Sequence, residues 1–191
     1  MPNKKNKASI FIVSAPSGAG KTTIVKHLLR RFPKMIFSVS YTTRKPRTGE
    51  KDGVDYCFIQ QDEFKQKIAT NTWAEWAKVY DNYYGTDAQF IDTNLARGNH
   101  VVLDIDVQGT EQMLERYPDI VTIFIMPPSM ETLRERLNAR GTDSQSVIEK
   151  RLQDAKNEVA KKDLYRHIII NDHLPSAVLQ LIAIVEKYIM D

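Results

Sequence analysis

The chain has 191 residues, of which 42% are apolar, and this size and composition suit one globular domain with small insertions. Its net charge of +3 fits small anionic ligands as well as nucleic acid and does not choose between them. The single cysteine, Cys57, excludes an internal disulfide, which agrees with a reducing, cytoplasmic compartment. No apolar run approaches the roughly 18 residues that span a membrane, and the N-terminus lacks the pattern of a secretory signal.

Strands and helices are predicted to alternate along most of the chain. Four short runs are rich in β-branched residues and do not alternate with polar ones, as in strands buried on both faces of a parallel sheet. These runs are Ile10–Val13, Val101–Leu103, Val121–Ile125 and Ile168–Ile170. The helix-like stretches are Lys21–Arg31, Thr110–Tyr117, Met130–Arg140, Val147–Val159 and Ala177–Tyr188. This alternation predicts a layered α/β domain.

A phosphate-binding loop is predicted between the first strand and the first helix. It consists of Ala15, Pro16, Ser17, Gly18, Ala19, Gly20, Lys21, Thr22 and Thr23. Glycines let backbone N–H groups surround an anion, and the following helix directs its positive end at the same anion. Lys21 is expected to reach the β- and γ-phosphates, and the Thr22 hydroxyl to bind Mg²⁺. Ala15 replaces the usual first glycine, which is tolerable if its φ is negative.

Residues 38–87 have a different composition and predict a small, mostly β insertion with one helix near Asp62–Ala69. Arg44 and Arg47 lie three residues apart around a proline, near several tyrosines. Two guanidinium groups beside tyrosyl hydroxyls suit a monophosphate dianion. Two arginines on a loop are also commonly plain solvated charges.

The strand at 101–103 runs into two carboxylates, Asp104 and Asp106. The carboxyl ends of strands in such sheets face the ligand crevice, and a carboxylate there can hold the water shell of Mg²⁺. Asp106 could instead be the N-cap of the next helix. Together with the loop at residues 15–23, the pair favours a functional role for at least one of them.

A third region, about residues 140–162, is dense in charge. Its helix shows little apolar face, so we expect it to project from the core and to move. Taken alone, Arg136 and Arg140 are typical of a solvated helix face. Asn171, after the last strand, could cap the last helix or face a ligand.

At this point the sequence resembles the guanylate kinases through essentially its whole length. The resemblance is carried by the block Thr42-Thr43-Arg44, Pro46-Arg47, Gly49-Glu50, Gly53 and Asp55-Tyr56, and by Tyr83-Tyr84-Gly85 paired with Leu103-Asp104-Ile105-Asp106. It implies transfer of the γ-phosphoryl group of ATP to GMP or dGMP. It also implies an α/β fold with a parallel central sheet in three layers, a small mostly β GMP-binding insertion and a helical lid.

The resemblance implies a role for each matched position. Arg44, Arg47, Tyr56 and Tyr84 would bind the GMP phosphate, braced by Glu50. Ser40, Glu75 and Thr86 would read the guanine, with Asp106 near its amino edge. Lys21, Arg44, Arg136, Arg140 and Arg151 would be catalytic, Asn171 would lie near adenine, and Mg²⁺ would be held by Thr22 and, through water, Asp104.

The same resemblance implies one domain over residues 1–191. The core would be 8–37, 88–135 and 163–191, the GMP-binding insertion 38–87 and the lid 136–162. The expected partners are the small molecules ATP and GMP, with no nucleic acid and no membrane, for a monomer or a homo-oligomer. His173 stands where an acidic residue is common in the family.

Two other functions fit parts of this pattern. One is a kinase of the same fold with another small phosphate acceptor, which the set Ser40, Glu75 and Thr86 disfavours. The other is a guanylate kinase-like binding module without catalysis. The intact Gly20-Lys21-Thr22 core disfavours it, because such modules have often lost the phosphate loop.

Overall fold

The computed structural model describes residues 8–79, 81–139, 141 and 143–189. Its centre is a five-stranded, fully parallel sheet with strand order β2-β7-β1-β8-β9. The strands are β1 (Ile10–Ser14), β2 (Ile36–Ser38), β7 (Val101–Asp104), β8 (Val121–Met126) and β9 (His167–Ile170). The four predicted strands are confirmed. The sequence analysis missed β2, because three residues at the sheet edge, two of them only half-buried and the third a serine, give no clear apolar run.

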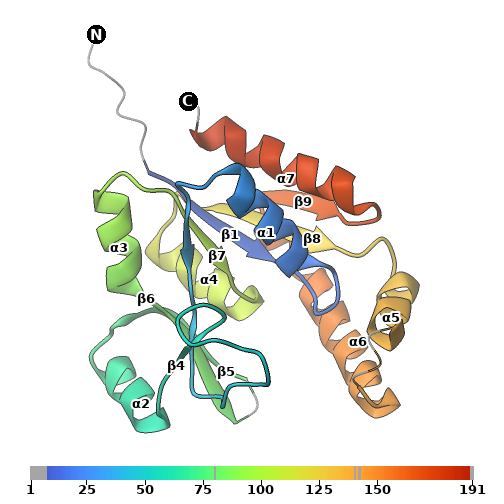
Figure 1. The fold of residues 1–191 in the computed structure, drawn as a ribbon, viewed down its shortest axis with the longest axis horizontal. Helices are drawn as coiled ribbons and strands as arrows, with labels where there is room; N and C mark the ends of the chain where they lie inside the picture. Colours follow the sequence, from blue (N-terminus) through green and yellow to red (C-terminus); the bar gives the residue numbers. More distant parts are fainter. Residues whose placement is uncertain (1–7, 80, 140, 142, 190–191) are drawn as a thin grey trace.

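Helices cover both faces of this sheet (Figure 1). Alternate residues of β1 point to opposite faces, as the period of two in a strand requires. Phe11 and Val13 pack with α1 (Lys21–Arg31) and α7 (Leu174–Ile189) on one face. Ile10 and Ile12 pack on the other face with α3 (Ala88–Ala96) and α4 (Val107–Arg116). The predicted three-layer α/β fold is therefore confirmed.

One helix was missed, and several others differ from their predicted bounds: α6 (Gln145–Ala160) begins at Gln145 rather than Val147, and α7 at Leu174 rather than Ala177. The analysis missed α3, because its polar residues interrupt the apolar period, although Asp87 caps it by accepting from the Phe90 N–H at 3.0 Å. The fourth helix, α4, begins three residues earlier than predicted, since Asp106 is its N-cap. No helix within the described ranges is long and apolar enough to cross a lipid bilayer.

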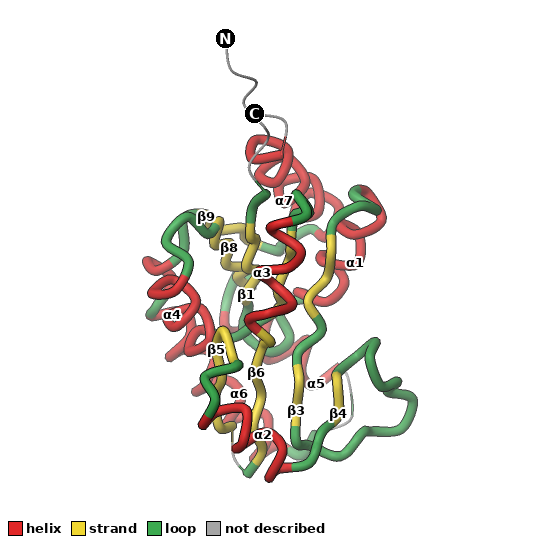
Figure 2. Tube along the Cα trace, turned by 90° about the vertical axis from the view of Figure 1, so that its left-hand side faces the viewer, coloured by secondary structure: helices red, strands yellow, loops and turns green. Residues whose placement is uncertain are grey.

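Residues between β2 and α3 form a second, smaller sheet with strand order β4-β3-β6-β5, below the central sheet in Figure 2. Its elements are β3 (Tyr41–Thr42), β4 (Cys57–Phe58), β5 (Trp73–Val79), β6 (Asn82–Asp87) and the helix α2 (Gln61–Ala69). Fully buried Phe64 of α2 stacks on Trp73 and Tyr83, with ring centroids 4.3 and 5.3 Å away. The predicted mostly β insertion is confirmed, and it has its own aromatic core.

The charged third region forms α5 (Met130–Ala139), α6 (Gln145–Ala160) and a short 3-10 helix (Lys162–Leu164). Contrary to expectation, α6 does have an apolar face, and it buries that face against α5. The buried residues of this pair are Leu133, Leu137, Ile148, Leu152 and Ala155. The pair thus has a hydrophobic cluster separate from the main core. In Figure 1 it lies at the lower right and the small sheet at the lower left.

Candidate active site

The loop after β1 has the geometry of a phosphate cradle. Gly18 and Gly20 have φ values of 99° and 94°, which favour glycine, and α1 begins at the next residue, Lys21. Among the described residues only Asn71 is a non-glycine with positive φ, so Ala15 meets the condition that its substitution requires. Backbone N–H groups and the positive end of α1 therefore converge on one anion-binding site.

Lys21 and Asp104 meet at the carboxyl end of the central sheet as an ion pair, each side chain about one-fifth exposed. The Ser14 hydroxyl donates to the Ile105 carbonyl and so joins the ends of β1 and β7 at this point. Thr22 is exposed beside this pair, on the first turn of α1. The described residues contain no group of three or more His, Cys, Asp or Glu side chains that could cage a metal. One hydroxyl and one carboxylate beside a phosphate cradle do suit Mg²⁺, which takes few protein ligands and keeps several waters.

The loop of the insertion brings a cation together with tyrosine rings. Arg44 donates to Glu50 Oε1 at 2.8 Å, and Glu50 Oε2 accepts from the Arg47 N–H at 2.7 Å. The hydrogen bond from Arg44 lowers the pKa of Glu50. The Arg44 guanidinium lies 5.4 Å from the Tyr56 ring centroid, and Tyr56 meets Tyr84 edge-on at 5.9 Å. This arrangement can receive a phosphate dianion, and the Arg47 side chain is exposed next to it.

A buried carboxylate lies on the same small sheet as Tyr84. Glu75 on β5 is 5% exposed and accepts from the Thr86 hydroxyl on β6 at 2.5 Å. Burial raises the pKa of Glu75 to about 7, and the negative charge of Asp106 adds to this effect. Ser40 is half-buried and directly precedes β3. A register shift in β5 between Trp73 and Glu75 lets consecutive side chains point inward, as bulges beside functional sites often do.

The capping alternative for Asp106 is confirmed. Its carboxylate caps α4 by accepting from the Gly109 N–H at 2.9 Å. Its charge also acts on Glu75. For Asn171 the capping alternative is wrong, because α7 begins only at Leu174. The Asn171 amide instead donates to the Ala19 carbonyl at 2.7 Å, and its Oδ1 is a buried acceptor without a hydrogen-bond partner among the described residues.

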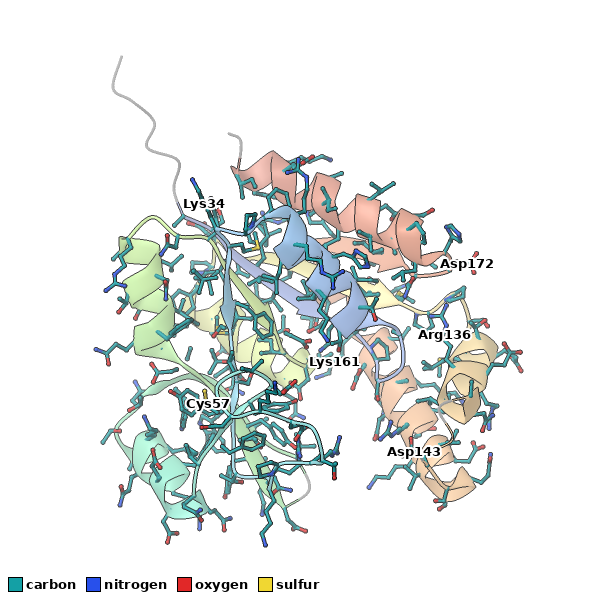
Figure 3. All side chains as sticks on the ribbon, viewed as in Figure 1. Lys34, Cys57, Arg136, Asp143, Lys161 and Asp172 are labelled. Atoms are coloured by element: carbon teal, nitrogen blue, oxygen red, sulfur yellow. The ribbon has the colours of Figure 1, made fainter. Side chains whose placement is uncertain are left out.

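The arginines of the third region lie near the phosphate loop. Arg136 is half-buried and donates to the Asn171 carbonyl at 2.8 Å; Figure 3 shows it beside the turn that holds Asp172. Arg151 on α6 is 3.2 Å from Asp143 and 3.5 Å from the Ser17 hydroxyl. Arg140 lies outside the described residues. At least two of the three arginines thus have partners in or beside the nucleotide cradle.

Sequence reasoning missed Glu158, a residue of α6 that lies in the same cavity as Asp106. With Asp106 and Lys78 it lines a cavity of about 660 Å³ between α6, the start of α4 and the end of β5. Burial raises the pKa of Glu158 to about 7, and the Lys21 charge opposes that rise. One signal was available: Arg151 and Glu158 are seven residues apart, two helical turns, and so share a face.

The comparisons with known proteins decide the family. The model of the family described as "Guanylate kinase" matches residues 7–188. The chain belongs to the guanylate kinase family. A guanylate kinase of Hydrogenovibrio crunogenus is 46% identical over 173 residues, which cover 91% of this chain and 84% of that protein. One of Symbiobacterium thermophilum is 46% identical over 185 residues, covering 97% and 87%.

A solved structure agrees with this assignment. The crystal structure of guanylate kinase from Anaplasma phagocytophilum superposes with a TM-score of 0.80 at 31% identity, and covers 97% of this chain and 88% of that one. Guanylate kinases are P-loop nucleotide kinases. The chain is therefore an enzyme that moves the γ-phosphoryl group of ATP to GMP, giving ADP and GDP.

Proposed function

We propose that the phosphate loop binds ATP and that the small sheet binds GMP or dGMP, with the two phosphates meeting above Lys21 and Asp104. The observation that carries this assignment is the buried Glu75–Thr86 pair in the insertion, on the same small sheet as Tyr84 of an arginine and tyrosine cluster. Burial raises the pKa of Tyr56 in that cluster, and the charges of Asp104 and Lys21 also act on its hydroxyl. The two half-sites are therefore neighbours, as direct transfer between two nucleotides requires.

On the ATP side, residues 15–23 surround the β- and γ-phosphates, and Lys21 leaves Asp104 to bind them. Thr22 and, through water, Asp104 would hold the Mg²⁺ that accompanies ATP, which would supply positive charge against the phosphates. Asn171 lies near the adenine. Its buried, unpartnered Oδ1 supports this role, since the adenine amino group is a donor.

On the GMP side, the phosphate is bound by Arg44, Arg47, Tyr56 and Tyr84, with Glu50 holding the loop. Ser40, Glu75 and Thr86 read the base, and Asp106 lies near its amino edge. Guanine presents N1–H and a 2-amino group, and one carboxylate can accept from both. Adenine has no donor at N1, so it would leave Glu75 buried and unsatisfied. That penalty supports strong discrimination.

The transfer itself needs no general base. A GMP phosphate oxygen attacks the γ-phosphorus in line, and the bond from that phosphorus to the ADP oxygen breaks. A phosphate monoester with a second pKa near 6 is mostly dianionic at pH 7 and is already a nucleophile. Lys21 and the lid residues Arg136, Arg140 and Arg151 stabilise the charge on the transferring group. Closure of the lid and the insertion excludes water and so limits ATP hydrolysis.

We assign these tasks to three parts of one domain: a core (8–37, 88–135 and 163–191), a GMP-binding insertion (38–87) and a lid (136–162). Its partners are small nucleotides rather than nucleic acid or a membrane, and its compartment is the cytoplasm. The lone, half-buried Cys57 agrees with a reducing compartment.

The experiment is a coupled ADP-release assay with a panel of GMP, dGMP, AMP, CMP, UMP and IMP. We expect fast turnover with GMP and dGMP and little with the other bases. Fast turnover with AMP, or none with GMP, would contradict the proposed base recognition.

A further inference from the structure

Gly109, the third residue of α4, lies directly against the carboxylate of Glu75. A Cβ atom at position 109 would be 2.6 Å from Glu75 Oε2 and 3.1 Å from Glu75 Cδ. The first distance is well below the van der Waals contact of two such atoms. Any residue other than glycine at position 109 would therefore push against the side chain that we assign to reading the base.

The backbone does not explain why glycine stands at this position. Gly109 is buried in the first turn of a helix and does not have a positive φ. Glycine is among the poorest helix formers, so a glycine here needs another reason. The close approach of Glu75 supplies that reason.

Hydrogen bonds hold both sides of this contact, the start of α4 and the strand β5, in place. The Thr110 hydroxyl donates to the Asp106 carbonyl at 2.8 Å and accepts from the Tyr165 hydroxyl at 3.1 Å, which fixes the start of α4. The Gln112 side chain holds α4 to β5 through two hydrogen bonds with the Trp76 backbone, at 2.8 and 3.1 Å. The helix and the strand that carries Glu75 are thus held together next to the contact.

Thr86 holds the Glu75 carboxylate from the opposite side, at 2.5 Å. Thr86 and Glu75 are paired across β5 and β6, so this bond is set by the strand register. The carboxylate therefore lies between a fixed hydroxyl and a fixed glycine, and extra volume at position 109 must turn it out of this position.

We propose that Gly109 is a positioning residue for guanine recognition, because its missing side chain leaves the space in which the Glu75 carboxylate is held toward the base. The inference rests on the proposed function, in which Glu75 reads guanine. Gly109 itself need not touch either nucleotide.

The test compares Gly109→Ala with wild type and with Glu115→Ala, a control at an exposed position of the same helix. We expect Gly109→Ala to raise KM for GMP about ten- to a hundred-fold and to lower the preference for GMP over AMP. KM for ATP should stay within about two-fold of wild type, because the phosphate loop is untouched. A wild-type KM for GMP in Gly109→Ala would overturn the inference.

A double-mutant cycle with Glu75→Ala separates this inference from the proposed function. If Glu75→Ala leaves KM for GMP unchanged, the base-reading role of Glu75 is wrong. If Glu75→Ala raises KM for GMP, adding Gly109→Ala to that variant should raise KM no further, since the overlap between the two side chains has been removed. If Gly109→Ala raises KM for GMP by the same factor in wild type and in Glu75→Ala, then Gly109 acts through the fold and not through Glu75.

Thermal unfolding of the same variants covers the case in which Gly109→Ala does not fold. The double variant Glu75→Ala with Gly109→Ala should then recover a folded protein, because the added methyl group no longer meets a carboxylate. A double variant that also fails to fold would overturn the inference.

Discussion

Glu75 is a buried carboxylate with one strong hydrogen bond, at a position where an apolar side chain would be more usual. Burying such a group is unfavourable unless it is paired. The Thr86 hydroxyl satisfies one oxygen, and the second faces the first turn of α4. Under the proposed function, this carboxylate is an acceptor for a ligand that brings its own donors, as guanine does.

The raised pKa of Glu75 predicts how the stability of the free protein depends on pH. Its pKa is about 7 in the folded state against an ordinary value of 4.5, mainly because of burial. The folded state therefore holds this proton more tightly, so the contribution of Glu75 to stability is lost as pH rises through 7. Glu75→Gln removes the ionisation. We expect its free energy of unfolding, relative to wild type, to improve by about 2 kcal/mol between pH 5.5 and pH 8.

Urea denaturation without nucleotide measures this difference, with Glu115→Gln as a matched carboxylate-to-amide control on the surface of α4. The control should show no such change with pH. A difference between Glu75→Gln and wild type that is flat across this range would mean that Glu75 is ionised throughout.

At the residue scale, pattern alone did not predict the base-reading set. Glu75 and Thr86 lie on two different strands and Ser40 directly precedes a third, so they share no local motif and came from the resemblance to a family. Gly109 and Gln112 carry no local signal either, because their contacts depend on how α4 packs against β5. Asp106 had two local explanations: the structure confirms the N-cap of α4, and the functional role stays a prediction.

At the scale of elements, the α5–α6 pair combines its own hydrophobic cluster with direct contact to the phosphate loop. A Cβ atom at Gly18 would lie 2.9 Å from Leu133 Cδ1, so α5 rests on the loop itself. Leu133 also packs in the cluster that α5 shares with α6. Movement of α6 is thereby connected to the loop that we expect to hold ATP.

Leu152→Ala tests this connection. Leu152 is 4% exposed within the pair, and its truncation should destabilise the pair by about 2–4 kcal/mol. Because the cluster is separate from the main core, we expect a loss of kcat and faster amide hydrogen exchange in α6, with KM for GMP unchanged. Lys156→Ala, an exposed position on the same helix, is the control. Unchanged exchange in α6 would contradict a separate, locally stabilised lid.

The helices and strands that could be predicted from the sequence are those with a clear hydrophobic pattern. The four apolar strands and the helix over Lys21–Arg31 were predicted because buried strands and an amphipathic helix have clear patterns. β2 was missed because three edge residues are too few to show one. The apolar face of α6 was overlooked because its three buried residues are surrounded by charges, and only the neighbouring α5 shows what they pack against.

At the scale of the molecule, the two proposed nucleotide sites are built from separate parts of the chain that meet at one end of the sheet. The lid contributes Glu158, and the insertion contributes Lys78, to the cavity between them. Asp106 and Glu158 are both acidic residues, and the Asp106 charge adds to the burial that raises the pKa of Glu158; Lys78 offers the opposite charge. Binding of two nucleotides is expected to draw these parts together over the Lys21–Asp104 pair.

Because the half-sites are separate, altering the base reader should change the choice of acceptor and leave the ATP site intact. The most direct test is the ratio of kcat/KM for GMP to that for AMP, in wild type and in Glu75→Ala. We expect the variant to lower this ratio about a hundred-fold or more, with KM for ATP within about two-fold of wild type. A Glu75→Ala enzyme that keeps the full preference for GMP would contradict the account.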